Sequence, residues 1–444
     1  MFNSIKLIIR KIIGKYYSSN YSNRINKDLP IVGRYGSFRF ISDYSLDSFK
    51  SIKNYNDKTN IASIKRKKII RFGFVVYTSS MWNVDELYHL LKKDTRFETS
   101  IILAHIKSKD KNALETEYNS TLSYFQNMHY SISEANTITN INQFDILFYL
   151  TPSPLLEKNI DLNNLPISVI VLHTSYSYML AGNAKKLGVG MYHWSLKYYT
   201  DSLYYKELLE KTPQYTHNAE YFGFPKMDQF FSSNEPRLSN KKVIIYAPHH
   251  SVNYSDFKSA TFEDNYQAIF DIAKKYSEST YWIYKPHPLL RANSVLAGIF
   301  NSVEEYDAYE KKWNELENGT VMNNGNYFSI FKGSDAMITD SISFLAEYQF
   351  THNPLLLLKS GKEKYNDFGE QVVKILYTCA GNNTEDIEKF VNNIIAEKDE
   401  MFSIRKEFFE SKLAYMKNGK TANKKIFEDI KSLISSDITN QIEL

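Results

Sequence analysis

The chain has 444 residues, of which 43% are hydrophobic and 15% aromatic, so it can bury a large core and is not globally disordered. This length exceeds one compact core and predicts two domains with a cleft between them. The single cysteine, Cys379, excludes an internal disulfide, and no Cys/His zinc spacing is present. A reducing cytoplasm suits this composition.

The formal net charge of +4 is unevenly distributed along the chain. Residues 1–68 hold 15 basic and 4 acidic residues, an excess of 11 positive charges, so the remainder carries a net charge of −7. Because the remainder is acidic and has no recognition motif, nucleic acid is not an expected partner. No apolar run is long enough to span a membrane, and Arg10 and Lys11 interrupt any signal peptide.

The segment Met1–Tyr17 has the pattern of an amphipathic basic helix. Its isoleucines and Phe2 lie near one helical face, and its basic residues lie mostly elsewhere. Such a helix can bind an anionic membrane surface, and packing on the protein's own body explains the pattern equally well. We therefore expect a cytoplasmic protein, peripheral at the inner face of the cell membrane.

Strands and helices alternate in the first half of the chain. Residues 18–66 are polar and are predicted to be an irregular lead-in. The predicted elements are strands 69–77, 98–106, 144–150 and 167–172, with helices 84–93 and 113–127. This alternation predicts a parallel sheet. The polar stretch 232–241 is predicted to be an interdomain linker.

The second half repeats the alternation. The predicted elements are strands 243–247, 281–285, 336–339 and 355–358, with helices 262–276 and 304–316 and a helical pattern from Thr384 onward. The predicted organisation is a basic segment (1–68), two Rossmann-like domains (69–231 and 242–383) joined by the linker, and C-terminal helices (384–444). Two parallel-sheet domains facing a cleft, with terminal helices, suggest the α/β GT-B architecture of nucleotide-sugar transferases or a relative such as a sugar-nucleotide epimerase.

Polar residues cluster where the predicted strands end, which is where open α/β sheets bind ligands. His173, His249 with His250, and His287 each follow a strand. The stretch Ser334–Leu358 reads as strand, turn, helix and strand, and it places Asp340, Ser341 and Ser343 at the start of the helix. Unpaired N–H groups in a first helical turn favour an anion such as a nucleotide phosphate, although an ordinary turn with ordinary capping gives the same pattern.

Several of these side chains suit a diphosphate. Lys285 and His287 can neutralise negative charge, and the prolines on either side of His287 fix its backbone. Glu347, one turn beyond Ser343, is predicted either to accept hydrogen bonds from ribose hydroxyls or to be a solvated helix carboxylate. There is no GxGxxG after the first strand, no Walker A sequence, no HExxH and no convincing DxD motif, so no metal or other cofactor is expected.

The residues resemble the CDP-glycerol glycerophosphotransferase family, the teichoic-acid and capsule type polymer transferases, over about residues 70–375. Tyr246–Pro248 matches the family's Tyr-Ala-Pro strand end, Gly223–Asp228 its Gly-Tyr-Pro-Arg-Asn-Asp segment, and Ile338–Ser343 with Glu347 its Ile-Thr-Asp-Tyr-Ser-Ser signature. His249–His250 stands where Thr-Trp-Arg is common in the family. His173–Ser175 is the nearest match to the family's His-Gly-Thr motif, with Thr174 in place of the glycine.

The resemblance implies attack by an acceptor hydroxyl on the β-phosphorus of a CDP-alditol, with release of CMP. His173 would be the base, in the acceptor domain, and His287 would contact the phosphates in the nucleotide-donor domain. The acceptor would be a cell-envelope glycan, free or lipid-linked. The candidate catalytic residues are His173 and His287, and the candidate nucleotide- or phosphate-binding residues are His249, His250, Lys285, Asp340, Ser341, Ser343 and Glu347.

Two other functions fit the same sequence. A GT-B glycosyltransferase could use the same cleft to move a sugar from a UDP- or CMP-sugar in surface polysaccharide synthesis. A catalytically silent subunit of an envelope-polymer complex could bind nucleotide or glycan without turnover. Nucleotide release from a panel of donors distinguishes the three.

Overall fold

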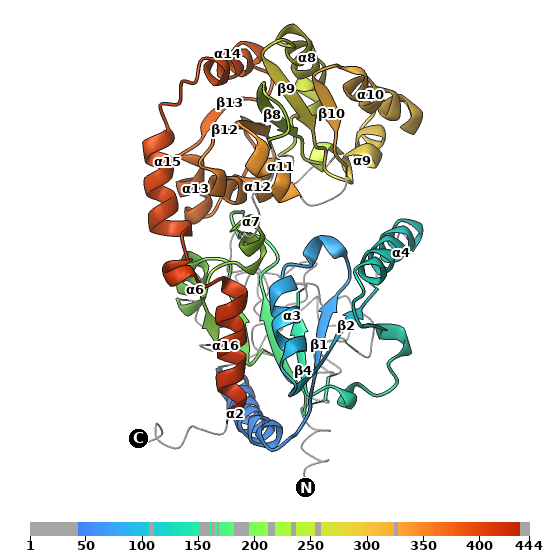
Figure 1. Ribbon diagram of the computed structural model, residues 1–444, viewed down its shortest axis with the longest axis vertical. Coiled ribbons are helices and arrows are strands. Elements are labelled where there is room, and N and C mark those ends of the chain that lie inside the picture. Colours follow the sequence, from blue (N-terminus) through green and yellow to red (C-terminus); the bar gives the residue numbers. More distant parts are fainter. Residues whose placement is uncertain are drawn as a thin grey trace.

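The computed structural model describes residues 43–105, 111–150, 160, 165–166, 168–181, 195–211, 218–231, 237–253, 259–323 and 327–435. The amphipathic helix predicted over Met1–Tyr17 lies outside these residues. The described chain forms two parallel sheets, each with its own helices, one above the other in Figure 1. The predicted pair of parallel-sheet domains is therefore confirmed.

The first sheet has the strand order β3-β2-β1-β4-β5-β6-β7, and every neighbouring pair is parallel. β1, an inner strand of this sheet, is buried at every position except Arg71, as expected for a strand covered by helices on both sides. The strands are β1 Ile70–Val76, β2 Phe97–Leu103, β3 Ile132–Glu134, β4 Ile146–Tyr149, β5 Ile170–Thr174, β6 Lys197–Tyr199 and β7 Ala219–Glu220. The helices of this part are α2 Asp43–Lys65, α3 Asp85–Lys93, α4 Lys111–Asn127, α6 Leu203–Glu210 and α7 Asp228–Phe231.

The second sheet has the order β10-β9-β8-β11-β12-β13, again parallel throughout. Apolar clusters cover both of its faces. The strands are β8 Lys242–Ala247, β9 Thr280–Tyr284, β10 Gly319–Val321, β11 Ala336–Thr339, β12 Leu355–Lys359 and β13 Tyr377–Ala380. The helices are α8 Phe262–Lys275, α9 Leu290–Leu296, α10 Val303–Glu315, α11 Tyr327–Gly333, α12 Ile342–Glu347, α13 Asp367–Val373, α14 Thr384–Ile395, α15 Phe402–Phe408 and α16 Ala422–Ile434.

The lead-in predicted to be irregular over residues 18–66 is wrong in its second half, where α2 runs from Asp43 to Lys65. The helix is rich in Ser, Asn and Asp, which are weak helix formers, so propensity alone did not reveal it. Ile64 on α2 is buried in one cluster with Ile430 and Ile434 of α16. Tertiary packing on the C-terminal helix thus overrides a weak local preference.

The C-terminal helices connect the two sheets. α14 and α15 lie beside the second sheet, the chain after α15 leads down to the first domain, and α16 lies against the first sheet (Figure 1). Ile426, Ile430 and Ile434 recur every four residues on α16 and are buried with the apolar side chains of β1 and α3. The last described helix is therefore part of the core of the first domain.

Asp228 holds the start of α16 against the first domain. Its carboxylate accepts the backbone N–H groups of Ala422 (2.9 Å) and Asn423 (2.8 Å) and the hydroxyl of Tyr415 (2.6 Å). The ring of Tyr415 in turn fills the space where a Cβ on Gly223 would lie, at 2.0 Å. Gly223 also has φ +105°, so this turn requires glycine.

Replacing Asp228 with Asn should destabilise the protein by about 2–3 kcal/mol, because at least one buried N–H group at the start of α16 then loses its acceptor. A shift of the urea unfolding midpoint measures this effect. The exposed carboxylate Asp271 on α8 is the matched control, and Asp271→Asn should change stability by less than about 0.5 kcal/mol. An unchanged midpoint for Asp228→Asn would contradict the anchoring role.

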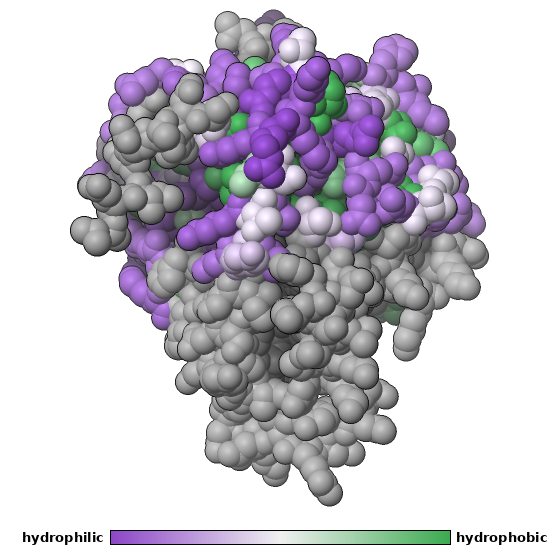
Figure 2. All heavy atoms as spheres, turned by 90° about the horizontal axis from the view of Figure 1, so that it is seen from below, coloured by the Kyte–Doolittle hydropathy of each residue, from purple (hydrophilic) through white to green (hydrophobic). Residues whose placement is uncertain are grey.

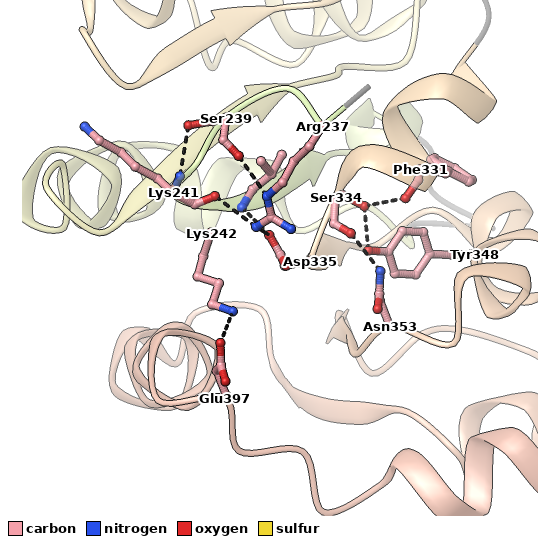
Figure 3. Close-up of polar contacts among 11 residues, drawn as sticks. Arg237, Ser239, Lys241, Lys242, Phe331, Ser334, Asp335, Tyr348, Asn353 and Glu397 are labelled. Atoms are coloured by element: carbon pink, nitrogen blue, oxygen red, sulfur yellow. Dashed lines mark hydrogen bonds and ion pairs between the residues drawn. The ribbon is translucent and has the colours of Figure 1, made fainter. Parts of the chain in front are cut away.

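The chain enters the second sheet through a set of polar contacts at the amino ends of its strands (Figure 3). Asp335, just before β11, accepts the N–H of Val243 on β8 (2.8 Å) and pairs with Arg237 (2.7 Å). Lys242 pairs with Glu397 beyond α14 (2.6 Å). These contacts fix the end of the predicted linker on the edge of the sheet opposite the strand ends that carry the histidines.

Among the described residues, no helix is both long and apolar enough to cross a membrane. The face seen from below, where α2 lies in Figure 1, is mainly hydrophilic in its described part (Figure 2). Arg66, Lys67 and Lys68, directly after α2, are all exposed. Three exposed basic residues therefore follow α2 directly.

Candidate active site

The carboxyl ends of the two sheets meet. After β5, the carbonyls of Met179 and Leu180 accept hydrogen bonds from Asn366 (2.6 and 2.9 Å), which follows β12. After β7, Lys226 pairs with Glu347 at the end of α12 (2.9 Å). The candidate site residues at both carboxyl ends therefore lie on facing edges of the two domains.

Three histidines from two strand ends form one cluster. The rings of His249 and His250, after β8, lie 4.3 Å apart, and the ring of His287, after β9, lies 4.1 Å from His250 and 5.6 Å from His249. The backbone N–H of His287 donates to the carbonyl of Pro248 (3.1 Å), which ties the two loops together. The structure thus brings together three candidate residues that are separated by up to 38 positions in the sequence.

The cluster is electrostatically unusual because its imidazoles are held neutral. Burial, and then the neighbouring imidazoles of His250 and His287, lower the pKa of His249 to about 2. Burial, and then His250 and Lys285, lower the pKa of His287 to about 3. Burial also lowers the pKa of His250. At neutral pH these rings can donate hydrogen bonds but carry no charge.

Asp340 anchors the histidine loop. Its Oδ1 accepts the N–H of His249 (2.6 Å), and its Oδ2 accepts the N–H (2.6 Å) and hydroxyl (3.0 Å) of Thr261 at the start of α8. Burial raises the pKa of Asp340 to about 6, against the lowering effect of these hydrogen bonds. The observed contacts are structural, and direct contact of Asp340 with a phosphate stays a prediction.

Lys285 is the cationic candidate of the site. Burial, and then the charge of Lys226, lower the pKa of its ammonium to about 8. The two lysines share the ring of Tyr327, with Lys226 Nζ at 5.3 Å and Lys285 Nζ at 5.7 Å from its centroid. A buried ammonium with a depressed pKa is stabilised strongly by an incoming anion.

Glu347 is completely buried, so the alternative of a solvated helix carboxylate is wrong. Its Oε1 accepts from Lys226 Nζ (2.9 Å) and its Oε2 from the hydroxyl of Tyr327 (2.6 Å). Both oxygens therefore already hold protein groups from other segments. Glu347 joins the two domains in this arrangement, and its predicted contact with ribose stays a prediction.

The two serines of the α12 turn differ in exposure. Ser341 is the buried N-cap residue of α12, and its N–H donates to Thr339 Oγ1 (3.0 Å). Ser343, in the first turn, is exposed. Ser343 is thus placed where it can reach a ligand, whereas Ser341 is packed into the turn.

His173 occupies the carboxyl end of β5 in the first domain. Its side chain is buried, and its ring stacks on that of Tyr198 with 4.9 Å between centroids and 20° between planes. Next to it, the hydroxyls of Ser175 and Tyr198 lie 2.6 Å apart, and Asn83 donates to the carbonyl of Ser175 (2.9 Å). His173 is therefore buried and stacked on the edge that faces the second domain.

Three further residues were not identified from the sequence. Lys226 lies in the Gly223–Asp228 motif but was given no role there, and Lys226 and Tyr327 contact Glu347 over separations of 121 and 20 residues, which no local pattern predicts. Asp201 follows β6, a strand of three residues that periodicity does not reveal, and accepts the N–H of Met179 (2.6 Å). Burial raises the pKa of Asp201 to about 7. Asp201 does have a local signal, because it is a polar residue just after a strand, but that strand is too short to be recognised from the sequence.

Solved structures with two facing Rossmann-like domains are similar to this fold. UDP-bound MnaA of Staphylococcus aureus has 14% identity and a TM-score of 0.50, covering 85% of this chain and 100% of that one. A putative UDP-N-acetylglucosamine 2-epimerase of Listeria monocytogenes has 13% identity and a TM-score of 0.50, covering 82% and 96%. A variant of the wall teichoic acid polymerase TagF has 14% identity and a TM-score of 0.50, covering 88% and 93%. No curated protein matches the sequence.

The fold is therefore that of the GT-B class, two Rossmann-like domains whose strand ends face one another. The sequence profile of the CDP-glycerol:poly(glycerophosphate) glycerophosphotransferase family matches residues 173–431, more than half of the chain. The protein belongs to this family and is a transferase, as the strand-end motifs predicted. The match begins at His173 and includes every candidate site residue named above.

Proposed function

We propose that the protein transfers a glycerol phosphate, or a related alditol phosphate, from a CDP-activated donor to a hydroxyl of a cell-envelope glycan and releases CMP. The observation that carries this proposal is the cluster of His249, His250 and His287 beside Lys285, on an edge that faces His173. A set of hydrogen-bond donors and one ammonium suits a diphosphate. An imidazole on the opposite edge suits proton transfer from an acceptor.

In the proposed reaction the acceptor oxygen forms a bond to the β-phosphorus of the donor, and the bond from that phosphorus to the bridging oxygen breaks. His173 takes the acceptor proton. The electron pair of the breaking bond stays on the departing CMP, where His287 and Lys285 stabilise the negative charge as it develops. The new product is a phosphodiester, and no group besides the donor and the acceptor is consumed.

A donor panel tests this proposal. The full chain is incubated with CDP-glycerol, CDP-ribitol, UDP-sugars or CMP-sugars together with a glycan acceptor, and nucleotide release is measured. CMP released from a CDP-alditol is the expected result, and it should be unchanged in EDTA because the proposed chemistry uses no metal. UDP, or CMP from a CMP-sugar, would instead identify a glycosyltransferase, and silence across the panel would identify a binding subunit.

The pH dependence of kcat/KM should reflect the loss of the proton from the Lys285 ammonium. Since the free enzyme sets the profile of kcat/KM, and the ammonium is the form that binds phosphate, kcat/KM on the alkaline side of its profile should fall about tenfold per pH unit above about pH 8. Lys285→Arg keeps the charge at higher pH, so its descending limb should move above about pH 10. The same limb in the Lys285→Arg variant would assign the titration to another group.

We also propose that the basic N-terminal segment binds an anionic membrane, where a lipid-linked glycan acceptor would be found. The protein should co-sediment with vesicles that contain phosphatidylglycerol at least about tenfold better than with phosphatidylcholine vesicles, because each basic residue near an anionic surface contributes about 1 kcal/mol. Changing Lys6, Arg10, Lys11 and Lys15 to Gln should abolish the difference. If that variant kept the preference of the unmodified protein for phosphatidylglycerol vesicles, the proposal would be contradicted.

A further inference from the structure

Each ring of the histidine cluster has an N–H donor directed at its Nδ1 atom. The backbone N–H of Leu289 donates to His287 Nδ1 (3.1 Å). The backbone N–H of Ser251 donates to His249 Nδ1 (3.3 Å), and the hydroxyls of Ser251 (3.0 Å) and Ser259 (3.3 Å) also lie within hydrogen-bond distance of this atom and can donate to it. A backbone N–H can only donate, so in both rings Nδ1 must be the unprotonated nitrogen.

His250 has the same arrangement through a side chain. Asn293 Nδ2, on α9, donates to the backbone carbonyl of His250 (2.9 Å) and lies 3.2 Å from His250 Nδ1. The contact with the carbonyl identifies this atom as the amide nitrogen, which carries only donors. His250 Nδ1 therefore faces an N–H donor, while the backbone carbonyl of His250 itself interacts with the ring and raises its pKa against the lowering effect of burial.

A neutral imidazole with an accepting Nδ1 carries its proton on Nε2. Protonating Nδ1 in any of the three rings would place an N–H against another N–H. The other ionisable groups near the cluster are Lys285, whose cation disfavours a second positive charge, and Asp340, whose carboxylate is bound to backbone and hydroxyl donors. These contacts favour one uncharged tautomer for the three rings, with the proton on Nε2.

This tautomer does not suit metal binding. A histidine that binds a metal through Nε2 normally donates its Nδ1–H to a carboxylate or carbonyl. Here the three Nδ1 atoms accept hydrogen bonds, so a metal at Nε2 would leave the imidazole without a proton. An anion, which accepts hydrogen bonds, has the complementary chemistry.

We infer that His249, His250 and His287 form a set of neutral Nε2–H donors for a phosphate group, and that Asn293 is a positioning residue that imposes this tautomer on His250. The inference rests on the proposed function only in naming the diphosphate of the donor as the phosphate. It makes Lys285 the group of this cluster that supplies positive charge. Binding of the diphosphate would then be insensitive to pH in the range where free histidines titrate.

The tautomers can be measured without any nucleotide. In the full chain labelled with ¹⁵N-histidine, long-range proton–nitrogen correlation spectra distinguish Nε2–H, Nδ1–H and doubly protonated rings, and His→Gln variants assign the three signals. We expect the Nε2–H pattern for all three from about pH 5.5 to about pH 8, because ordinary histidines titrate in this interval. An Nδ1–H ring, or titration of any of the three in this range, would overturn the inference.

Asn293 offers a matched pair of variants. Asn293→Asp replaces the donor with a carboxylate, so His250 should change to the Nδ1–H form and its pKa should rise. Asn293→Ala removes the donor without adding an acceptor, so burial should still keep His250 neutral. If His250 has the same tautomer and pKa in the Asp variant as in the unmodified protein, Asn293 does not position it.

Ligand titrations then test the anion role separately from the proposed donor. Inorganic pyrophosphate and CDP-glycerol are each added to the labelled protein, and both should shift the three Nε2–H signals. Shifts with pyrophosphate but not with CDP-glycerol would support the anion site and refute the proposed donor. If neither ligand moves these signals, the donor-set inference is wrong.

Discussion

Replacing His287 with Ala should lower kcat/KM for CDP-glycerol by about 100- to 1,000-fold, the usual cost of removing one donor aimed at charge that develops in the transition state. His287 is the ring whose loop is most firmly fixed. Pro286 and Pro288 restrict its backbone, its N–H donates to Pro248 (3.1 Å), and its Nδ1 accepts from Leu289 (3.1 Å). The effect should therefore appear in catalysis, with a loss of stability below about 1.5 kcal/mol.

Two further variants make this result interpretable. His287→Gln keeps a neutral N–H donor near the position of Nε2 and should recover about tenfold of the loss, since a charge is not required there. His89→Ala is the control, because His89 is half exposed on α3 in the first domain and pairs with Asp85. It should change kcat/KM by less than about twofold. If His287→Ala retained more than about a third of the activity, His287 would have no role at the phosphate.

The parts of this site that were predictable from the sequence are those with a local signal. His173, His249, His250, Lys285 and His287 each stand directly after an apolar run, and parallel strands bring such residues to one edge of a sheet. The long alternating elements were predictable for the same reason. Strands of two or three residues, such as β6 and β7, are too short to show a period, so Asp201, just after β6, was not predicted.

Contacts between distant segments account for the rest. Glu347 looked like a ribose ligand or a solvated carboxylate because the sequence does not show that Lys226, 121 positions earlier, contacts it. The return of α16 to the first sheet has the same character, since the helical period of Ile426, Ile430 and Ile434 predicts a buried face without indicating which core buries it. Neither the contact of Lys226 with Glu347 nor the packing of α16 on the first sheet is local in sequence. Predicting either contact requires knowing how distant segments are placed in space.

The ion pair of Lys226 and Glu347 should be costly to break because it is buried. Glu347 is fully buried and the side chain of Lys226 is only 15% exposed. Removing either partner leaves a buried charge without its counter-ion, so Glu347→Ala and Lys226→Met should each destabilise the protein by about 3–5 kcal/mol, measured by urea unfolding. The double variant Glu347→Leu with Lys226→Met has no unpaired charge and should recover most of this loss.

A second measurement separates the catalytic consequence of this pair from its structural one. The charge of Lys226 helps to hold the pKa of Lys285 down at about 8, so in Lys226→Met the pKa of Lys285 should rise. The descending limb of kcat/KM should then move to higher pH, although the protein is less stable. If Lys226 had a purely structural role, the variant would have a lower maximal kcat/KM, and the pH at which kcat/KM falls would not change. A shifted limb would mean that Lys226, from the first domain, tunes the ammonium that holds the phosphate in the second.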